Sequence, residues 1–130
     1  MRRNVRIVPD HPTLVSVPAQ SAHEEYDILI LPGGGPGAKT FSTTDTVLEL
    51  INNFRKADKW IALICAGTTA LVAADKAHEN GKKKVTSHPS VAEEIKSAGW
   101  EYSEDRVVVD GKVITSRGWV KSTLMEILIC

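Results

Sequence analysis

The sequence predicts an α/β fold in which helices sandwich a mostly parallel sheet, with one antiparallel hairpin added. Two short, continuously apolar runs, Ile28–Leu31 and Ile61–Ile64, are typical of strands buried on both faces. A stretch with helical periodicity separates these runs, and a second helical stretch follows the later one. Strands that alternate with helices indicate βαβ units, whose strands run parallel.

The first half of the chain contains the first of these units. A short apolar stretch at Val5–Val8 is followed by a polar, proline-containing segment at Pro9–Glu25. The strand at Ile28–Leu31 runs into a glycine-rich loop that continues to Gly37. Apolar residues then recur at i, i+3, i+4 and i+7 from Val47, which predicts an amphipathic helix that begins near Thr44.

The second half continues the alternation and adds the hairpin. An alanine-rich helix is expected after Ile61–Ile64, followed by a short strand at Val85–Ser87. Pro89 suits the first turn of a further helix, which Gly99 should end. The valine-rich runs on either side of Asp110-Gly111 then predict an antiparallel hairpin.

The composition is that of one globular domain, which we expect to span residues 1–130. Sixteen Lys and Arg balance sixteen Asp and Glu, so nucleic acid is not expected as a partner. No apolar run approaches the roughly 18 residues of a membrane span, and no apolar signal core follows the start. The two cysteines, Cys65 and Cys130, form no disulfide scaffold, which favours a reducing, cytoplasmic compartment.

Cys65 is the most informative residue because it ends a buried strand and begins a tight turn into a helix. Hydrolases place a nucleophilic serine in this position, which is known as a nucleophile elbow. The backbone N–H groups that follow can stabilise a thiolate and can also hold an oxyanion formed on a substrate. The alternative is that Cys65 is a small buried apolar residue at a strand end.

The glycine-rich loop and a histidine supply the other candidates. The loop differs from a phosphate-binding P-loop because Ala38 replaces a required glycine, so its backbone N–H groups are better suited to a second oxyanion donor. A flexible turn is the structural alternative. His88 follows a predicted strand, so it could exchange protons with the thiol or be an ordinary surface residue. No spacing of the histidines suggests a metal site.

The chain resembles the ThiJ/PfpI superfamily, in the branch of the Parkinsonism-associated protein deglycase and the glyoxalase III enzymes. The resemblance rests on four segments in the family's order, namely Asp27–Gly34, Ile64–Leu71, Thr86–Pro89 and Tyr102–Gly118. It implies a flavodoxin-like three-layer sandwich. It also implies that Cys65 is the nucleophile, that His88 lies nearby, and that Gly34 and Ala66 donate to the oxyanion. Arg3 matches a family arginine near the homodimer contact, so the resemblance implies a homodimer.

The chain also departs from the family pattern at both ends. Family members open with a strand and helix that carry a glutamate hydrogen-bonded to the cysteine, and this sequence starts after that unit. Neither Glu24 nor Glu25 matches that glutamate, so we expect a fold that is incomplete at the N-terminus and an impaired activity. The family's small-residue turn after Ser116-Arg117-Gly118 is replaced by Trp119 and its successors.

The resemblance implies a cofactor-independent enzyme that converts small 2-oxoaldehydes such as methylglyoxal to D-lactate, with a related deglycase activity. One alternative is a redox sensor or chaperone-like protein that uses the same cysteine, which would react once rather than turn over. Another is an amide hydrolase or peptidase, which rests only on the wider superfamily.

Overall fold

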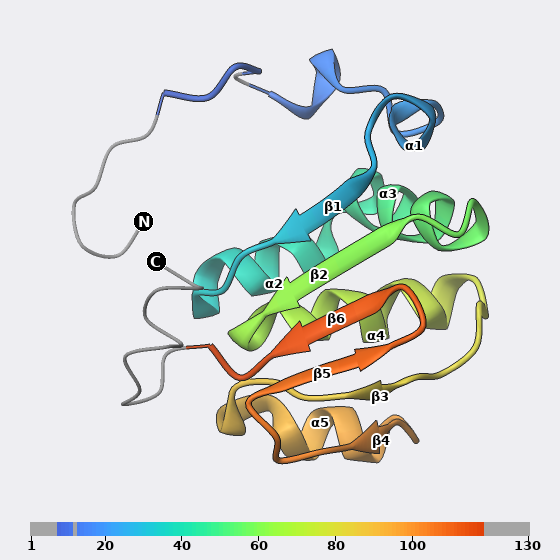
Figure 1. The fold of residues 1–130 in the computed structure, drawn as a ribbon. Coiled ribbons are helices and arrows are strands. Elements are labelled where there is room, and N and C mark those ends of the chain that lie inside the picture. The colour runs from blue at the N-terminus through green and yellow to red at the C-terminus, as the bar shows by residue number, and fades with distance from the viewer. Residues whose placement is uncertain (1–7, 12, 119–130) are drawn as a thin grey trace.

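The computed structural model describes residues 8–11 and 13–118, and its elements have the predicted α/β order (Figure 1). The strands are β1 (Ile28–Leu31), β2 (Trp60–Ile64), β3 (Lys84–Val85), β4 (Glu101–Tyr102), β5 (Val107–Asp110) and β6 (Val113–Ser116). The α-helices are α1 (Ala22–Glu25), α2 (Gly35–Thr43), α3 (Asp45–Lys56), α4 (Thr68–Ala77) and α5 (Ala92–Ser97). Short 3-10 helices lie at η1 (Leu14–Ser16), η2 (Cys65–Gly67) and η3 (Pro89–Val91).

The main sheet has the strand order β1-β2-β6-β5. The parallel pairing of β1 with β2 confirms the first prediction from the sequence, and β2 also pairs in parallel with β6. β5 and β6 form the predicted antiparallel hairpin, in which Asp110 is paired with Val113. β3 and β4 form a separate parallel pair beside it. The carboxyl ends of β1, β2 and β6 therefore meet at one edge of the main sheet.

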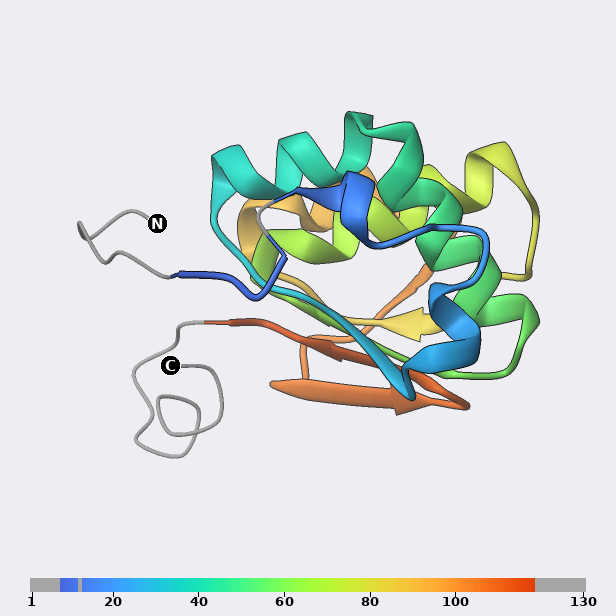
Figure 2. The ribbon, with the colours of Figure 1, turned by 90° about the horizontal axis from the view of Figure 1, so that it is seen from above.

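Helices α2 to α5 lie on one face of the main sheet, and the core lies between these helices and the strands (Figure 2). The predicted apolar stripe of α3 is buried; it consists of Val47, Leu50, Ile51 and Phe54. On the sheet side, Ile61 and Leu63 of β2 are fully buried. The alternation of β2 thus directs every second side chain towards the helices.

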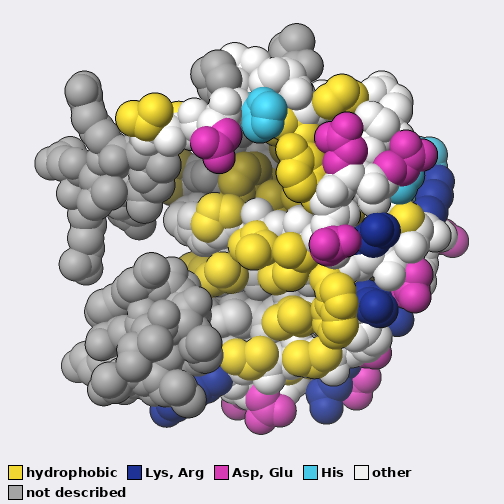
Figure 3. Space-filling view, turned by 45° about the horizontal axis from the view of Figure 1, so that its top comes forward, with side chains coloured by type: hydrophobic (Ala, Val, Ile, Leu, Met, Phe, Trp, Pro, Cys, Tyr) yellow, Lys and Arg dark blue, Asp and Glu magenta, His cyan; other side chains and the backbone are white. Residues whose placement is uncertain are grey.

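The opposite face of the main sheet carries apolar side chains that the described residues leave open. Ile30, Ala62, Ile114 and Val109 are paired in register across the four strands. Ile30 is 54% exposed and Val109 is 60% exposed, and hydrophobic side chains gather on this side of the molecule (Figure 3). The expectation that β1 is buried on both faces is therefore wrong for the part of the chain described, because helices α2 to α5 all cover the other face of the sheet.

The glycine-rich loop is shorter than predicted. The sequence predicts that the first helix after β1 begins near Thr44, whereas in the structure α2 already begins at Gly35. Pro36 occupies the first turn, where its fixed φ favours a helix and its missing N–H costs no hydrogen bond. The Ala38 N–H donates to Gly34 O at 2.8 Å. Thr44 lies between α2 and α3 and is the N-cap of α3, which therefore begins where the sequence predicts a helix to begin.

Two further differences concern short elements. The predicted strand at Val85–Ser87 is observed at Lys84–Val85, because the Thr86 N–H donates to a side chain and not to a neighbouring strand. Most of the apolar stretch at Val5–Val8 lies outside the described residues, as do Arg3 and Cys130. Within the part of the chain that is described, no helix is both long enough and apolar enough to cross a membrane.

Candidate active site

Cys65 lies at the edge of the sheet where three parallel strands end (Figure 1). Gly33 follows β1, Cys65 follows β2 and Gly118 follows β6. A Cβ atom added to Gly33 or to Gly118 would lie 2.5 Å from the Cys65 Cβ, which is closer than real side chains approach. The half-buried thiol therefore lies between two stretches of glycine backbone that leave room for it.

The backbone at Cys65 is strained, with a φ of +60° in the left-handed region. This conformation costs about 1–2 kcal/mol for a residue that carries a Cβ. Such strain concentrates at functional sites, and a sharp, strained turn from strand to helix is the geometry of a nucleophile elbow. The structure thus has at Cys65 the local geometry that the sequence predicts.

The turn after Cys65 packs tightly against the end of β1. A Cβ atom added to Gly67 would lie 3.0 Å from Leu31 O and 3.1 Å from Pro32 O, so this position needs a glycine. The hydroxyl of Thr69 donates to Ala66 O at 2.8 Å, and this hydrogen bond also stabilises the turn. Because the first N–H groups of a helix have no partner within it, this turn presents free donors beside the thiol.

Gly34 and Ala66, the two predicted oxyanion donors, lie on the two loops that meet at Cys65. Gly34 has a φ of +102° and directly follows Gly33, whose backbone contacts the Cys65 side chain. Its N–H makes no hydrogen bond to any residue that the structure describes. A cavity of about 440 Å³ lies beside this turn, between α2 and η3, with Gly35, Ala66 and Ser90 in its walls.

The backbone of His88 is tied directly to Cys65, since the His88 N–H donates to Cys65 O at 3.2 Å. Its ring is engaged elsewhere, because Nδ1 accepts from the Ser90 N–H at 3.1 Å and lies 2.8 Å from Ser90 Oγ. In the neutral ring the proton then sits on Nε2. Among the described residues, no hydrogen bond joins the Cys65 thiol to the His88 ring or to a carboxylate.

A buried set of threonines positions the segment that carries His88, and sequence reasoning missed it. The Thr86 N–H donates to Thr115 Oγ1 at 2.9 Å, and Thr68 Oγ1 donates to Thr86 O at 2.9 Å. All three residues are fully buried. These bonds connect the end of β3 with β6 and α4, which strand pairing does not connect at this place. Gly118 was also missed as a neighbour of Cys65, although a glycine just past a strand end was a usable signal.

We expect Thr115→Val to destabilise the protein by about 1–3 kcal/mol, because it leaves the buried Thr86 N–H without an acceptor. Valine keeps the size and the β-branch of threonine, so the change isolates the hydroxyl. Thr43→Val is the matched control, since that hydroxyl is exposed, and it should change the free energy of unfolding by less than about 0.5 kcal/mol. Urea denaturation measures both; equal stabilities would show that the hydroxyl is dispensable.

The described residues contain no group of three or more His, Cys, Asp or Glu side chains placed to hold a metal ion. At Cys65 the arrangement places a thiol beside backbone N–H donors, which suits a nucleophile with an oxyanion site.

The chain is similar in sequence to known proteins. A model of the DJ-1/PfpI family matches residues 2–129. The chain is 45% identical over 96 residues to the glutathione-independent glyoxalase DJ-1 of Schizosaccharomyces pombe, which covers 73% of this chain and 48% of that protein. It is 39% identical over 119 residues to the Parkinson disease protein 7 homolog of Danio rerio, over 89% of this chain and 58% of that protein.

Solved structures show the same similarity in three dimensions. The crystal structure of DJ-1beta from Drosophila melanogaster matches with a TM-score of 0.74 at 34% identity, over 89% of this chain and 58% of that one. DJ-1 of Schizosaccharomyces pombe matches with a TM-score of 0.71 at 38% identity, over 85% and 55%. The chain thus spans about half the length of the curated relatives it matches.

Proposed function

The chain belongs to the DJ-1/PfpI family, and we propose that it is a cysteine-dependent glyoxalase of the glyoxalase III type that needs no cofactor. Its substrate would be a small 2-oxoaldehyde such as methylglyoxal, and its product D-lactate. The observation that carries the proposal is the strained Cys65, held between Gly33 and Gly118 at the carboxyl edge of the sheet. Two relatives of this chain, from Schizosaccharomyces pombe and Caenorhabditis elegans, are named glutathione-independent glyoxalases.

The first step would be attack of the Cys65 thiolate on the aldehyde carbon. A carbon–sulfur bond forms, and the electron pair of the carbonyl moves to its oxygen. The N–H groups of Gly34 and Ala66 would stabilise the resulting oxyanion, which is protonated to a hemithioacetal. Donors fixed in a turn are effective here because they do not need to reorient during the reaction.

The second part of the reaction would move a proton between the two substrate carbons. A base removes the proton from the former aldehyde carbon, and the adjacent carbon is protonated through an enediol, which gives a thioester of the 2-hydroxy acid. We assign His88 to this exchange as a proton donor, because its Nδ1 accepts from Ser90 and leaves the proton on Nε2. Water then hydrolyses the thioester, releasing lactate and restoring the thiol.

Product analysis with the 130-residue chain tests this proposal. We expect methylglyoxal to yield many equivalents of D-lactate per protein, measured with an enantiomer-specific lactate assay. A redox sensor or binding protein that uses the same cysteine would consume one equivalent at most. Loss of methylglyoxal that stops at one equivalent, or that gives no D-lactate, would contradict the proposal.

A further inference from the structure

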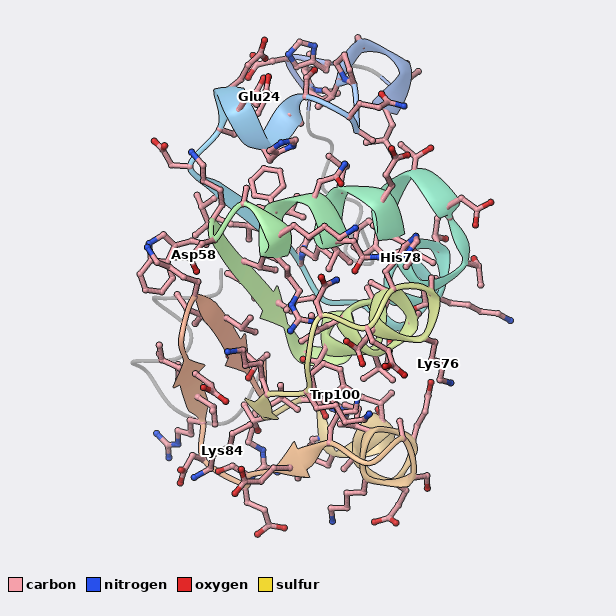
Figure 4. The ribbon with its side chains drawn as sticks, turned by 90° about the vertical axis from the view of Figure 1, so that its right-hand side faces the viewer. Glu24, Asp58, Lys76, His78, Lys84 and Trp100 are labelled. Atoms are coloured by element: carbon pink, nitrogen blue, oxygen red, sulfur yellow. The ribbon has the colours of Figure 1, made fainter. Side chains whose placement is uncertain are left out.

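Four positively charged residues line a small cavity at the amino-terminal edge of the sheet, the edge opposite Cys65. The cavity has a volume of about 130 Å³, and its walls carry Arg55, Lys59, Lys83 and Lys112 with a single carboxylate, Asp58. These residues come from α3, from the turn before β2, from the loop before β3 and from the β5–β6 turn. Figure 4 faces this edge, with Asp58 and Lys84 labelled.

A buried polar network fixes one wall of the cavity. The Arg55 side chain is only 4% exposed and donates to Asp75 Oδ1 at 3.3 Å and to Asn80 O at 3.1 Å, as well as to Gly81 O. Burial lowers the pKa of Arg55, and the charge of Asp75 opposes that effect. Asn80 also donates to Asn52 Oδ1 at 2.8 Å. The network holds the loop that leads into Lys83 against α3.

The lysines that line the cavity have few ion-pair partners among the described residues. Lys83 and Lys112 are half-buried and form no ion pair with any described residue. The Lys83 ammonium lies over Gly111, where an added Cβ would be 3.1 Å away, and the Lys112 ammonium lies 4.9 Å from the centre of the Trp60 ring. Lys59 has only a 3.9 Å contact with the fully solvated carboxylate of Asp27.

The charges of this cavity leave an excess of two positive charges. Asp75 neutralises Arg55, so three lysines and the one carboxylate of Asp58 remain among the charged residues that line the cavity. Cations near the end of a helix are explained by its partial negative charge, which accounts for Arg55 at the end of α3. The partial charge of a helix end does not explain the positions of Lys83 and Lys112, because both residues lie outside the helices.

We propose that this cavity is a binding site for a phosphate group. A phosphate dianion matches the excess charge. The ion also fits the volume of about 130 Å³, because a cavity needs only roughly 10–15 Å³ to hold one water. The site would bind the group through charge-assisted hydrogen bonds from Lys59, Lys83 and Lys112. It lies at the other end of the strands from Cys65, so it does not depend on the proposed activity.

The test is a titration of the full chain with inorganic phosphate, followed by backbone amide NMR at constant ionic strength. We expect saturable shifts at Lys83, Gly111 and Lys112, which chloride and nitrate do not cause. A parallel titration with phenyl phosphate separates two sources of the group. Equal or tighter binding of the ester indicates a phosphate carried on a larger molecule, and binding of the inorganic ion alone indicates free phosphate.

Three variants that each remove one positive charge show whether the residues of the cavity bind the phosphate. Lys83→Gln and Lys112→Gln should each weaken phosphate binding by about tenfold, as expected for the loss of one charge-assisted hydrogen bond. Lys76→Gln, which removes an exposed charge from α4, should leave it within about twofold. Shifts that do not saturate, or that chloride reproduces, would overturn the proposal. Equal weakening by all three variants would also overturn it.

Discussion

Replacing Cys65 with serine is expected to lower D-lactate formation by at least about 10³-fold, because removal of an enzyme's nucleophile typically costs that much or more. A serine hydroxyl has nearly the same size as a thiol, so it fits between Gly33 and Gly118 without a clash. It is not ionised near neutral pH and has no base joined to it among the described residues, so it is a far weaker nucleophile. The rate of D-lactate release with methylglyoxal measures the effect.

The same substitution at Cys130, the other cysteine of the sequence, is the matched control, and we expect it to leave the rate within about twofold because the proposed chemistry uses only the Cys65 thiol. Thermal unfolding should show that the Cys65→Ser chain remains folded, since its turn keeps the same shape. A Cys65→Ser protein that retains a tenth or more of the activity would show that lactate arises without this thiol. The proposed chemistry would then be wrong.

Much of this fold could be predicted because local pattern decides it. The apolar runs at Ile28–Leu31 and Ile61–Ile64 are strands, and the 3.6-residue periodicity from Val47 gives the buried stripe of α3. Asp110-Gly111 gives the hairpin. In contrast, α2 was missed because its first turn is rich in glycine, and glycine usually indicates a loop. The proline there was the better signal.

The site could be predicted only where it follows from strand order along the chain. Cys65 directly follows a buried strand, so its place at the carboxyl edge could be inferred from sequence. The approach of Gly118 to it depends on the parallel pairing of β2 with β6, which joins segments about fifty residues apart. The bond from the Thr86 N–H to Thr115 has the same origin. The orientation of the His88 ring depends on a local contact of Nδ1 with Ser90, which the strand pattern does not reveal.

We expect Gly33→Ala to damage both the stability and the activity of the protein. The new methyl group would lie 2.5 Å from Cys65 Cβ, 3.1 Å from Ile64 O and 3.3 Å from Cys65 Sγ. Ordinary contact begins at 3.4 Å, so the Cys65 turn must move by roughly 1 Å. Overpacking of this kind costs about 1–3 kcal/mol of stability, and a displacement of 1 Å can lower turnover by about 10²-fold.

Gly37→Ala is the control for this prediction, because an added Cβ at Gly37 meets no atom within 4 Å. Neither Gly33 nor Gly37 has a positive φ, so alanine is free of backbone strain at both positions and only the contact differs. The control should keep its activity within about twofold and its unfolding temperature within a few degrees. Iodoacetamide labelling of Cys65 should change in the Gly33 variant alone, since only that methyl group reaches the thiol. If both variants instead react and turn over like the parent chain, the thiol has more room than the structure gives it, and the close approach of Gly33 does not position the nucleophile.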